Sequence, residues 1–430
     1  MPPPSTRPAS PKRDVGSPSD ANNERPIESE EDLTPRPDDW FEDKSAESQI
    51  SFTYRNGQEA RQTLILESLG GGVAMLDFDQ DGDLDLFFTG GGTIKGKTAA
   101  IKGRPSALFR NDGSWKFTDV THAMGLDVAG DYSHGCAVAD FNRDGYPDLF
   151  VCCYGNSHLF QNVEGRQFKD VTGEAHLQAD GWCTAAAWSD IDQDGYPDLF
   201  VTRYLTWSPK TARPCFHRDG QRDVCSPGDY PAAGDFLFHN RGDGTFEEIS
   251  KSAGITRLGK GLGVVSADVN NDGWMDFYVA NDECDNDLYL GGPGRTFQET
   301  SLRAGVATNE FGMHDGSMGV DAADLTGDGK LDLWVTNFEA EDNVLYQNLG
   351  NGLFTQISAK AGLAGQSRRQ VGFGTALADF DGDGRLDIFV ANGHVFYHGG
   401  QLPYLQRPQL FQNNAEGRFK NVSEVGGPYF

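Results

Sequence analysis

The chain has 430 residues with 64 acidic and 36 basic side chains, and its formal net charge at pH 7 is −28. This charge disfavours nucleic acid as a partner, because nucleic-acid binding needs a basic surface. No run of 18 apolar residues occurs, so the sequence predicts no membrane-spanning helix. No apolar signal-peptide core follows Met1 either.

The first 38 residues are rich in Pro, Ser and acidic residues and contain few apolar ones. Such a segment cannot bury enough surface to offset its conformational entropy, so residues 1–38 are expected to be a disordered tail or linker. Trp40 and Phe41 mark the start of the packed domain, which we expect to cover residues 39–430. Ile50–Tyr54 then alternates apolar and polar residues, which predicts a strand.

An acidic motif of the form Asp-x-(Asp/Asn/Thr)-x-Asp-Gly-x-x-Asp occurs six times. Its oxygen-bearing residues at positions 1, 3, 5 and 9 are Asp77, Asp79, Asp81 and Asp85; Asp140, Asn142, Asp144 and Asp148; Asp190, Asp192, Asp194 and Asp198; Asp268, Asn270, Asp272 and Asp276; Asp324, Thr326, Asp328 and Asp332; and Asp379, Asp381, Asp383 and Asp387. Oxygen ligands at this spacing, with a turn-forming Gly at position 6, suit a hard cation of the size of Ca²⁺. The sequence therefore predicts up to six Ca²⁺ ions, one in each loop.

The repulsion between the carboxylates supports a metal in these loops. Two carboxylates about 4 Å apart repel by roughly 4 kcal/mol at an effective dielectric constant of 20. The alternative is a set of acidic surface turns, since Asp and Gly are common turn residues. Six copies in the same frame favour the metal interpretation over that alternative.

The residues after each loop exclude an EF-hand, which needs a Glu at position 12 and flanking helices. Position 12 is apolar in every copy: Phe88, Val151, Val201, Val279, Val335 and Val390. Short apolar runs rich in aromatic and β-branched residues lead to these positions and predict buried strands. The loops are therefore expected within a β-structure.

The motif belongs to a repeating unit with four predicted strands. A strand of small residues such as 70–76 precedes each loop, and the apolar strand follows it. A third strand ends in a Leu-Phe-x-Asn turn, as at 159–162, and a fourth begins with Phe, as at 168–171. Four short strands in tandem predict an all-β fold, a β-propeller of four-stranded blades with six complete repeats.

Closure of the ring is a separate question, because Ile50–Tyr54 resembles a fourth strand without a blade of its own. One interpretation is a six-bladed ring with one additional strand. The interpretation we favour is derivation from a seven-bladed propeller that has lost most of one blade.

The repeat region resembles the FG-GAP/VCBS repeat family of integrin-α-like propellers, and more narrowly the bacterial relatives of cartilage acidic protein. The acidic loops, Gly70-Gly-Gly-Val-Ala74, the Leu-Phe-x-Asn turns, the Phe-x-Asp-Val-Thr strands and Asn392-Gly-His-Val395 carry this resemblance. The resemblance implies a calcium-stabilised propeller that is exported and acts in binding or adhesion.

The seven cysteines are too few for a disulfide scaffold. Cys136, Cys152, Cys153 and Cys183 fall in predicted strands and are expected to be buried thiols. Cys215 and Cys225 lie in a loop rich in Pro, Arg and Gly and form the one plausible disulfide, given an oxidising compartment.

Function is expected to be non-enzymatic binding of a protein or carbohydrate ligand on a loop-lined face, outside the cell or in the periplasm. The alternative is a polysaccharide lyase- or dehydratase-like enzyme, which would need a base and a charge stabiliser in one cleft. The pairs that could supply them are Tyr132 with His134, His314 with Asp315, and His394 with Tyr397. A purely structural role in a larger exported complex is a third possibility.

Overall fold

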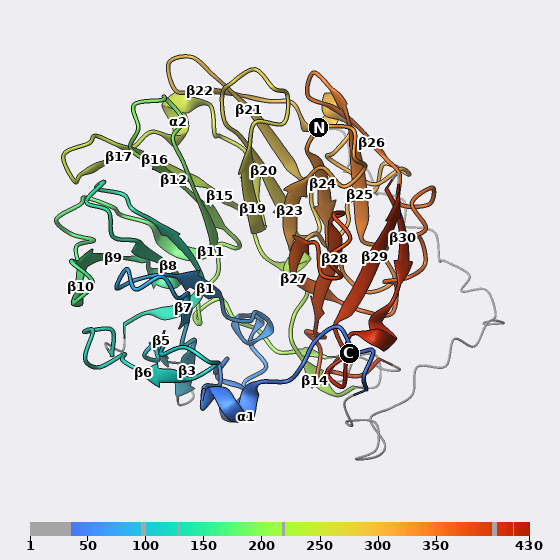
Figure 1. Ribbon diagram of the computed structural model, residues 1–430. Coiled ribbons are helices and arrows are strands. Elements are labelled where there is room, and N and C mark those ends of the chain that lie inside the picture. The colour runs from blue at the N-terminus through green and yellow to red at the C-terminus, as the bar shows by residue number, and fades with distance from the viewer. Residues whose placement is uncertain (1–35, 96–99, 128–129, 217–219, 398–401, 416) are drawn as a thin grey trace, which may run out of the picture.

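The computed structural model describes residues 36–95, 100–127, 130–216, 220–397, 402–415 and 417–430. Six antiparallel four-stranded blades surround a central axis, and strand order within each blade follows chain order (Figure 1). Blades 2 and 3 are also hydrogen-bonded to each other and form one eight-stranded sheet. The blades are, from the inner strand outward, β1 (Val73–Leu76), β2 (Asp85–Phe88), β5 (Ala107–Asn111) and β6 (Phe117–Asp119); β7 (Tyr132–Ala139), β8 (Asp148–Asn156), β9 (His158–Val163) and β10 (Gln167–Asp170); β11 (Asp180–Ser189), β12 (Asp198–Arg203), β16 (Phe236–Asn240) and β17 (Phe246–Glu248); β19 (Gly261–Ala267), β20 (Asp276–Asn281), β21 (Asp287–Gly292) and β22 (Thr296–Glu299); β23 (Val320–Ala323), β24 (Asp332–Val335), β25 (Val344–Gly350) and β26 (Leu353–Gln356); and β27 (Gly372–Ala378), β28 (Asp387–Asn392), β29 (Gln409–Ala415) and β30 (Arg418–Asn421).

The remaining elements are short. They are α1 (Ser45–Ser48), η2 (Gln58–Ala60), η3 (Ile65–Ser68), β3 (Gly92–Lys95), β4 (Ala100–Gly103), β13 (Cys215–Phe216), β14 (Arg222–Asp223), η4 (Pro227–Asp229), β15 (Ala233–Gly234), α2 (Ser250–Ala253), β18 (Leu258–Gly259), α3 (Ser301–Ala304) and η5 (Ser423–Val425). Among the described residues, no helix has the length and apolarity that crossing a membrane requires. Residues 1–35 of the predicted tail lie outside the described residues, so the predicted tail stays a prediction.

Apolar cores between neighbouring blades hold the ring together. Blades 3 and 4, for example, meet through the rings of Phe200 and Phe277, whose centroids lie 4.6 Å apart. The inner strands are rich in Gly and Ala because they crowd around the axis: a Cβ on Gly319, just before β23, would lie 1.9 Å from the carbonyl oxygen of Phe373 in the next blade. The predicted all-β propeller with six complete blades is confirmed.

The ring has an opening between blade 6 and blade 1. Inner strands pack side by side from β1 round to β27, and within the described part of the chain β27 shows no comparable packing on β1. Ala74 and Leu76 of β1 face blade 2, whereas Val73 and Met75 on its other side are 59% and 66% exposed. This opening agrees with the predicted derivation from a seven-bladed propeller.

The N-terminal segment, residues 36–55, spans this opening (Figure 1). The Trp40 backbone N–H donates to Val425 O, and the Phe41 ring packs on Phe380 and Phe430 of blade 6, both at 5.4 Å. At the other end Phe52 stacks on Phe88 of blade 1 at 5.2 Å.

The strand predicted over Ile50–Tyr54 is wrong. These residues alternate between partly buried and exposed positions as expected, but the structure assigns no strand to them, and only the next residue, Arg55, forms a single bridge, with Gly91. Within the described part of the chain, no strand pairs with residues 50–54. Burial alternates in any extended chain that lies on a surface, so the pattern could not distinguish the two cases.

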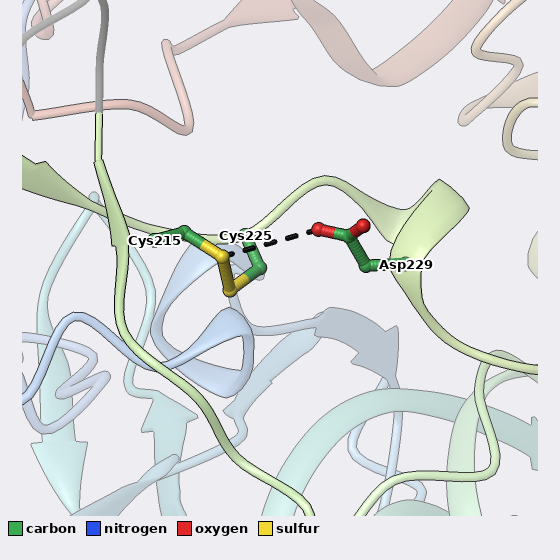
Figure 2. A group of neighbouring side chains, drawn as sticks. All are labelled: Cys215, Cys225 and Asp229. Atoms are coloured by element: carbon green, nitrogen blue, oxygen red, sulfur yellow. Dashed lines mark hydrogen bonds between the residues drawn. A yellow bond between two sulfur atoms is a disulfide. The ribbon is translucent and has the colours of Figure 1, made fainter.

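Three segments form a cap over one face of the ring: residues 55–69, 204–235 and 393–408, apart from the undescribed 217–219 and 398–401. Arg222 Nη2 donates to Gln62 O at 2.6 Å, and Tyr397 N donates to Asp223 Oδ1 at 3.2 Å. The second segment contains the predicted disulfide, Cys215–Cys225 (Figure 2). Cys152, Cys153 and Cys183 are buried thiols, as expected, and Cys136 is partly buried.

Candidate metal-binding loops and the central cavity

The six acidic loops lie at the end of the axis opposite the cap. Each loop connects the inner strand of a blade to the second strand, as Asp77–Leu84 connects β1 to β2. The inner strands begin beside the central cavity, where Gly71, Gly135 and Gly374 form part of its wall. Their far ends, and therefore all six loops, share the other face.

The first Asp of each loop folds the loop around its carboxylate. Asp77 accepts the backbone N–H of Asp81 on one oxygen and that of Gly82 on the other, both at 3.1 Å. Bonds from positions 5 and 6 recur in the other five loops, at Asp140, Asp190, Asp268, Asp324 and Asp379. Gly82, at position 6 of the first loop, has φ of 94°, a left-handed conformation that residues with a side chain rarely adopt.

The ninth Asp of each loop is buried and fixes the loop to the third strand. Asp148 accepts from Phe141 N at 3.1 Å and from Asn162 N at 2.7 Å. Burial raises the pKa of Asp148 to about 8 and that of Asp276 to about 7. Burial thus disfavours these negative charges in the metal-free protein, and a bound cation would favour them.

In three of the six loops the third position supplies a buried oxygen without a partner. Asp79 Oδ1, Asp192 Oδ1 and Thr326 Oγ1 are buried without a hydrogen-bond partner. Carboxylate oxygens of Asp77, Asp79 and Asp85 lie within 4.8 Å of one another, as do those of Asp190, Asp192 and Asp194 and those of Asp379, Asp381 and Asp387. Orphaned oxygens within clustered carboxylates fit a hard cation.

Basic side chains beside three loops were missed by the sequence reasoning. Lys330 Nζ contacts Asp328 Oδ2 at 2.9 Å, and Arg385 contacts Asp383. His239 Nδ1 lies 2.9 Å from Asp198 Oδ1 and 3.7 Å from Asp192 Oδ2. His239 occupies the variable position of Leu-Phe-x-Asn, so the turn motif could have placed it beside the loop.

The asparagine of this turn links neighbouring blades. Asn162 Nδ2 in blade 2 donates to Phe78 O in the loop of blade 1 at 2.8 Å, and Asn240, Asn348 and Asn413 repeat this bond to the preceding blade. Blade 4 has Gly291 at this position, and Asn111 of blade 1 reaches only Leu84 O of its own blade. The absence of a link from Asn111 agrees with the opening before blade 1.

A central cavity of about 870 Å³ lies at the capped end of the axis. Backbone glycines of the inner strands form its wall, and Tyr54, Asn56, Tyr404 and Gln406 contribute polar groups from the N-terminal and blade 6 segments. Glu67 also lines it, and burial raises the pKa of this carboxyl to about 7. The size and the mixture of polar and apolar walls suit a ligand site.

Two of the histidines considered for catalysis, His134 and His394, line this cavity but are engaged in structural bonds. His134 Nε2 accepts from Trp182 Nε1 at 3.0 Å, and burial lowers the pKa of His134 to about 4. His394 Nδ1 accepts from Phe396 N at 3.0 Å, and its Nε2 lies 3.3 Å from Glu339. His314 contacts Asp285 at 3.1 Å and does not line the cavity.

A family model described as FG-GAP-like repeat matches residues 77–151, 140–201, 216–279, 268–335 and 324–390. The chain therefore belongs to the FG-GAP-like repeat family, which confirms the predicted resemblance.

Among curated proteins, the chain is 31% identical over 192 residues to cartilage acidic protein 1 of Homo sapiens and 30% identical over the same length to that of Mus musculus. Each match covers 42% of this chain, and the chain spans only 27% and 28% of these relatives.

Among solved structures, a lectin from Agrocybe aegerita that recognises non-reducing terminal N-acetylglucosamine has a TM-score of 0.47 at 17% identity, covering 83% of both chains. An exotype rhamnogalacturonan lyase has a TM-score of 0.40 at 13% identity, covering 83% of this chain and 54% of the lyase.

Proposed function

We propose that this protein is a calcium-stabilised extracellular or periplasmic β-propeller that binds a protein or carbohydrate ligand without acting as an enzyme. The observation that carries the calcium part is the set of buried, unpartnered oxygens at position 3 of three acidic loops, on Asp79, Asp192 and Thr326. Calcium would be held by the residues at positions 1, 3, 5 and 9, with the backbone carbonyl at position 7. Each ion would neutralise carboxylates that otherwise repel, and six ions would reduce the formal net charge from −28 to −16.

Two features support the proposed location. Disulfides such as Cys215–Cys225 persist in oxidising compartments and are rare in the cytosol. Structural calcium sites with modest affinity are also readily filled outside the cell, where calcium reaches about 10⁻³ M.

The central cavity supports the proposed binding role, because it combines aromatic rings with amide and hydroxyl groups on a rigid ring. The alternative enzyme would need a base free to accept a proton. His134 and His394 already use their ring nitrogens in bonds to the protein, so the geometry favours a binding module.

The first experiment is thermal unfolding with excess EDTA and with millimolar calcium, together with metal analysis of the dialysed protein. We expect several calcium ions per chain and a large rise in Tm on adding calcium. Asp79→Asn should remove one ion, whereas Asp180→Asn, an exposed aspartate outside the loops, should remove none. Absence of bound metal together with an unchanged Tm would refute the calcium proposal.

A second experiment tests the ligand. The calcium-loaded protein is applied to an array of glycans and of extracellular-matrix proteins, with Gln406→Ala and Tyr404→Ala as cavity variants. Binding that both variants weaken would support the cavity as the ligand site. Binding that neither variant changes would place the ligand elsewhere.

A further inference from the structure

A second, smaller cavity of about 170 Å³ lies between the cap and the ring. All three cap segments contribute to its lining, through Ile65 and Leu69, through Val224–Pro227, and through Val395 and Phe396. Tyr204 also belongs to the second cap segment, and blades 4 to 6 supply the rest, including Leu262, Met318 and Phe373. Cys225 of the disulfide is part of the wall, so the cross-link helps to fix the shape of the cavity.

Aromatic rings form much of this wall. Phe338 and Phe396 meet at right angles, with centroids 6.0 Å apart and an interplanar angle of 88°. Phe373 and Tyr204 complete the set of four aromatic side chains that line the cavity. In this edge-to-face contact one ring directs its edge at the face of the other, and a ring face that remains open to the cavity attracts an organic cation.

The charged groups of the lining are both acidic. They are Asp282, which accepts a hydrogen bond from Tyr204 Oη at 2.6 Å, and Glu283, which is exposed and accepts from Ser226 Oγ at 3.2 Å. The described residues that line the cavity include no Lys, Arg or His. Lys260 lies near Asp282 and offsets part of its charge, yet burial still raises the pKa of Asp282 to about 7.

We propose that this cavity binds an organic ammonium group, either of a small alkylammonium compound or of a lysine side chain. The four rings would surround the alkyl substituents, and the Asp282 carboxylate would compensate the charge. The volume is adequate, since an apolar cavity of about 150 Å³ holds benzene. The largely apolar wall, with two carboxylates, disfavours a bare metal ion, which needs six or more oxygen ligands if it is calcium. The site is separate from the acidic loops and adjoins the central cavity, and it goes beyond the proposed function. The lining residues that the two cavities share are Ser68, Leu69, Leu262, Met318 and Phe373.

The test uses the calcium-loaded protein at about pH 8 and isothermal titration with choline chloride. The matched control is the uncharged alcohol in which a tert-butyl group replaces the trimethylammonium group of choline. We expect choline to bind at least about tenfold more tightly than this alcohol, because a cation over aromatic rings in a desolvated site is attracted by the ring quadrupoles and the neutral alcohol is not. Equal binding of the two compounds, or binding of neither, would overturn the proposal.

Variants locate the site and separate the two sources of the ammonium group. Phe338→Leu and Asp282→Asn should each weaken choline binding by about tenfold, whereas Phe311→Leu, at a ring that is 78% exposed, should not. Circular dichroism and Tm verify that each variant folds, and Phe338→Leu serves as the test if Asp282→Asn does not fold. Titration with a peptide containing lysine or trimethyllysine then identifies the source: tighter binding of a peptide than of choline indicates a protein ligand. Unchanged choline binding in both cavity variants would contradict the assigned site.

Discussion

The side-chain amide of Asn162 donates a hydrogen bond to the carbonyl oxygen of Phe78 at 2.8 Å, from the third strand of blade 2 to the acidic loop of blade 1. Asn162 is fully buried, and the same amide also donates to Pro147 O in its own blade. Asn162 is thus hydrogen-bonded to the acidic loop of blade 1 and to the acidic loop of blade 2. Such bonds link blades 1 and 2, 2 and 3, 4 and 5, and 5 and 6, and each of them ends at an acidic loop.

Replacing this amide should therefore loosen the ring. Asn162→Ala leaves two buried carbonyl groups without donors, and we expect the free energy of unfolding to fall by about 1–3 kcal/mol. The matched control is Asn111→Ala, because Asn111 is exposed to solvent in part and its amide bonds only within blade 1. Chemical denaturation in calcium measures both variants. Equal losses at the two positions would contradict an inter-blade role for Asn162.

The raised pKa of Glu67 predicts that the folded protein becomes less stable as pH rises. Burial raises its pKa from 4.5 to about 7, although Leu64 N and Tyr397 Oη donate to its carboxyl group. The folded state therefore holds the proton more strongly, and the wild-type protein loses stability as pH rises from 4.5 through 7. Glu67→Gln removes this loss, so the variant should gain on the order of 1–3 kcal/mol relative to wild type at about pH 8 and little at about pH 4.

Denaturant unfolding at several pH values measures this difference, with Glu59→Gln as an exposed control. A gain for Glu67→Gln that is the same at every pH would mean that its cause is not the ionisation of Glu67.

The raised pKa of His158 predicts that replacing this residue costs more stability at low pH than at high pH. Asp131 and Asp170 raise its pKa to about 9, with Nδ1 2.9 Å from Asp170 Oδ2. Its contribution to stability is fully present below pH 6.5 and is lost as pH rises through 9. His158→Gln should therefore cost about 1–2 kcal/mol at about pH 6 and much less at about pH 10.

The exposed pair of His122 and Asp127 provides the control, since His122→Gln should have little effect at either pH. Titration of the His158 ring protons by NMR checks the pKa directly. A midpoint near 6.5 would contradict the ion-pair interpretation.

The contacts of Phe41 with blade 6 predict that the N-terminal segment stabilises this blade. Its ring packs on Phe380 and Phe430, so Phe41→Ala removes a half-buried aromatic contact and should cost about 1–2 kcal/mol. Hydrogen exchange should accelerate first in β27–β30, because the segment closes the side of blade 6 that lacks a neighbouring blade. Phe311→Ala is the control at an exposed ring. A uniform acceleration throughout the ring would argue against a local role.

The repeats were predictable from the sequence because each copy contains the same residues at the same spacing and therefore folds in the same way locally. The glycine at position 6 of the loop, the buried ninth aspartate and the Leu-Phe-x-Asn turn each recur at fixed spacing, so six copies reinforce one interpretation. The cap was not predictable, because its three segments occur once each and are far apart in the chain. Contacts such as Tyr397 N to Asp223 Oδ1 depend on a tertiary arrangement that no periodicity encodes.

Two further features of the molecule could not be predicted from the local sequence. Lys330 and Arg385 occupy position 7 of their loops, a position that varies among the six copies, and their side chains contact the aspartate at position 5. Ile50–Tyr54 has the burial pattern of a strand without a partner strand. Both cases depend on neighbours that a local pattern does not include.

Placing all six acidic loops at one end of the axis gives the molecule a strong electric polarity along that axis. On a positively charged support the protein should adsorb by the loop end and leave the capped end facing the solution. Calcium would weaken that adsorption by neutralising the anchoring end. The direction in which the molecule presents its cavities would then depend on the calcium concentration around it.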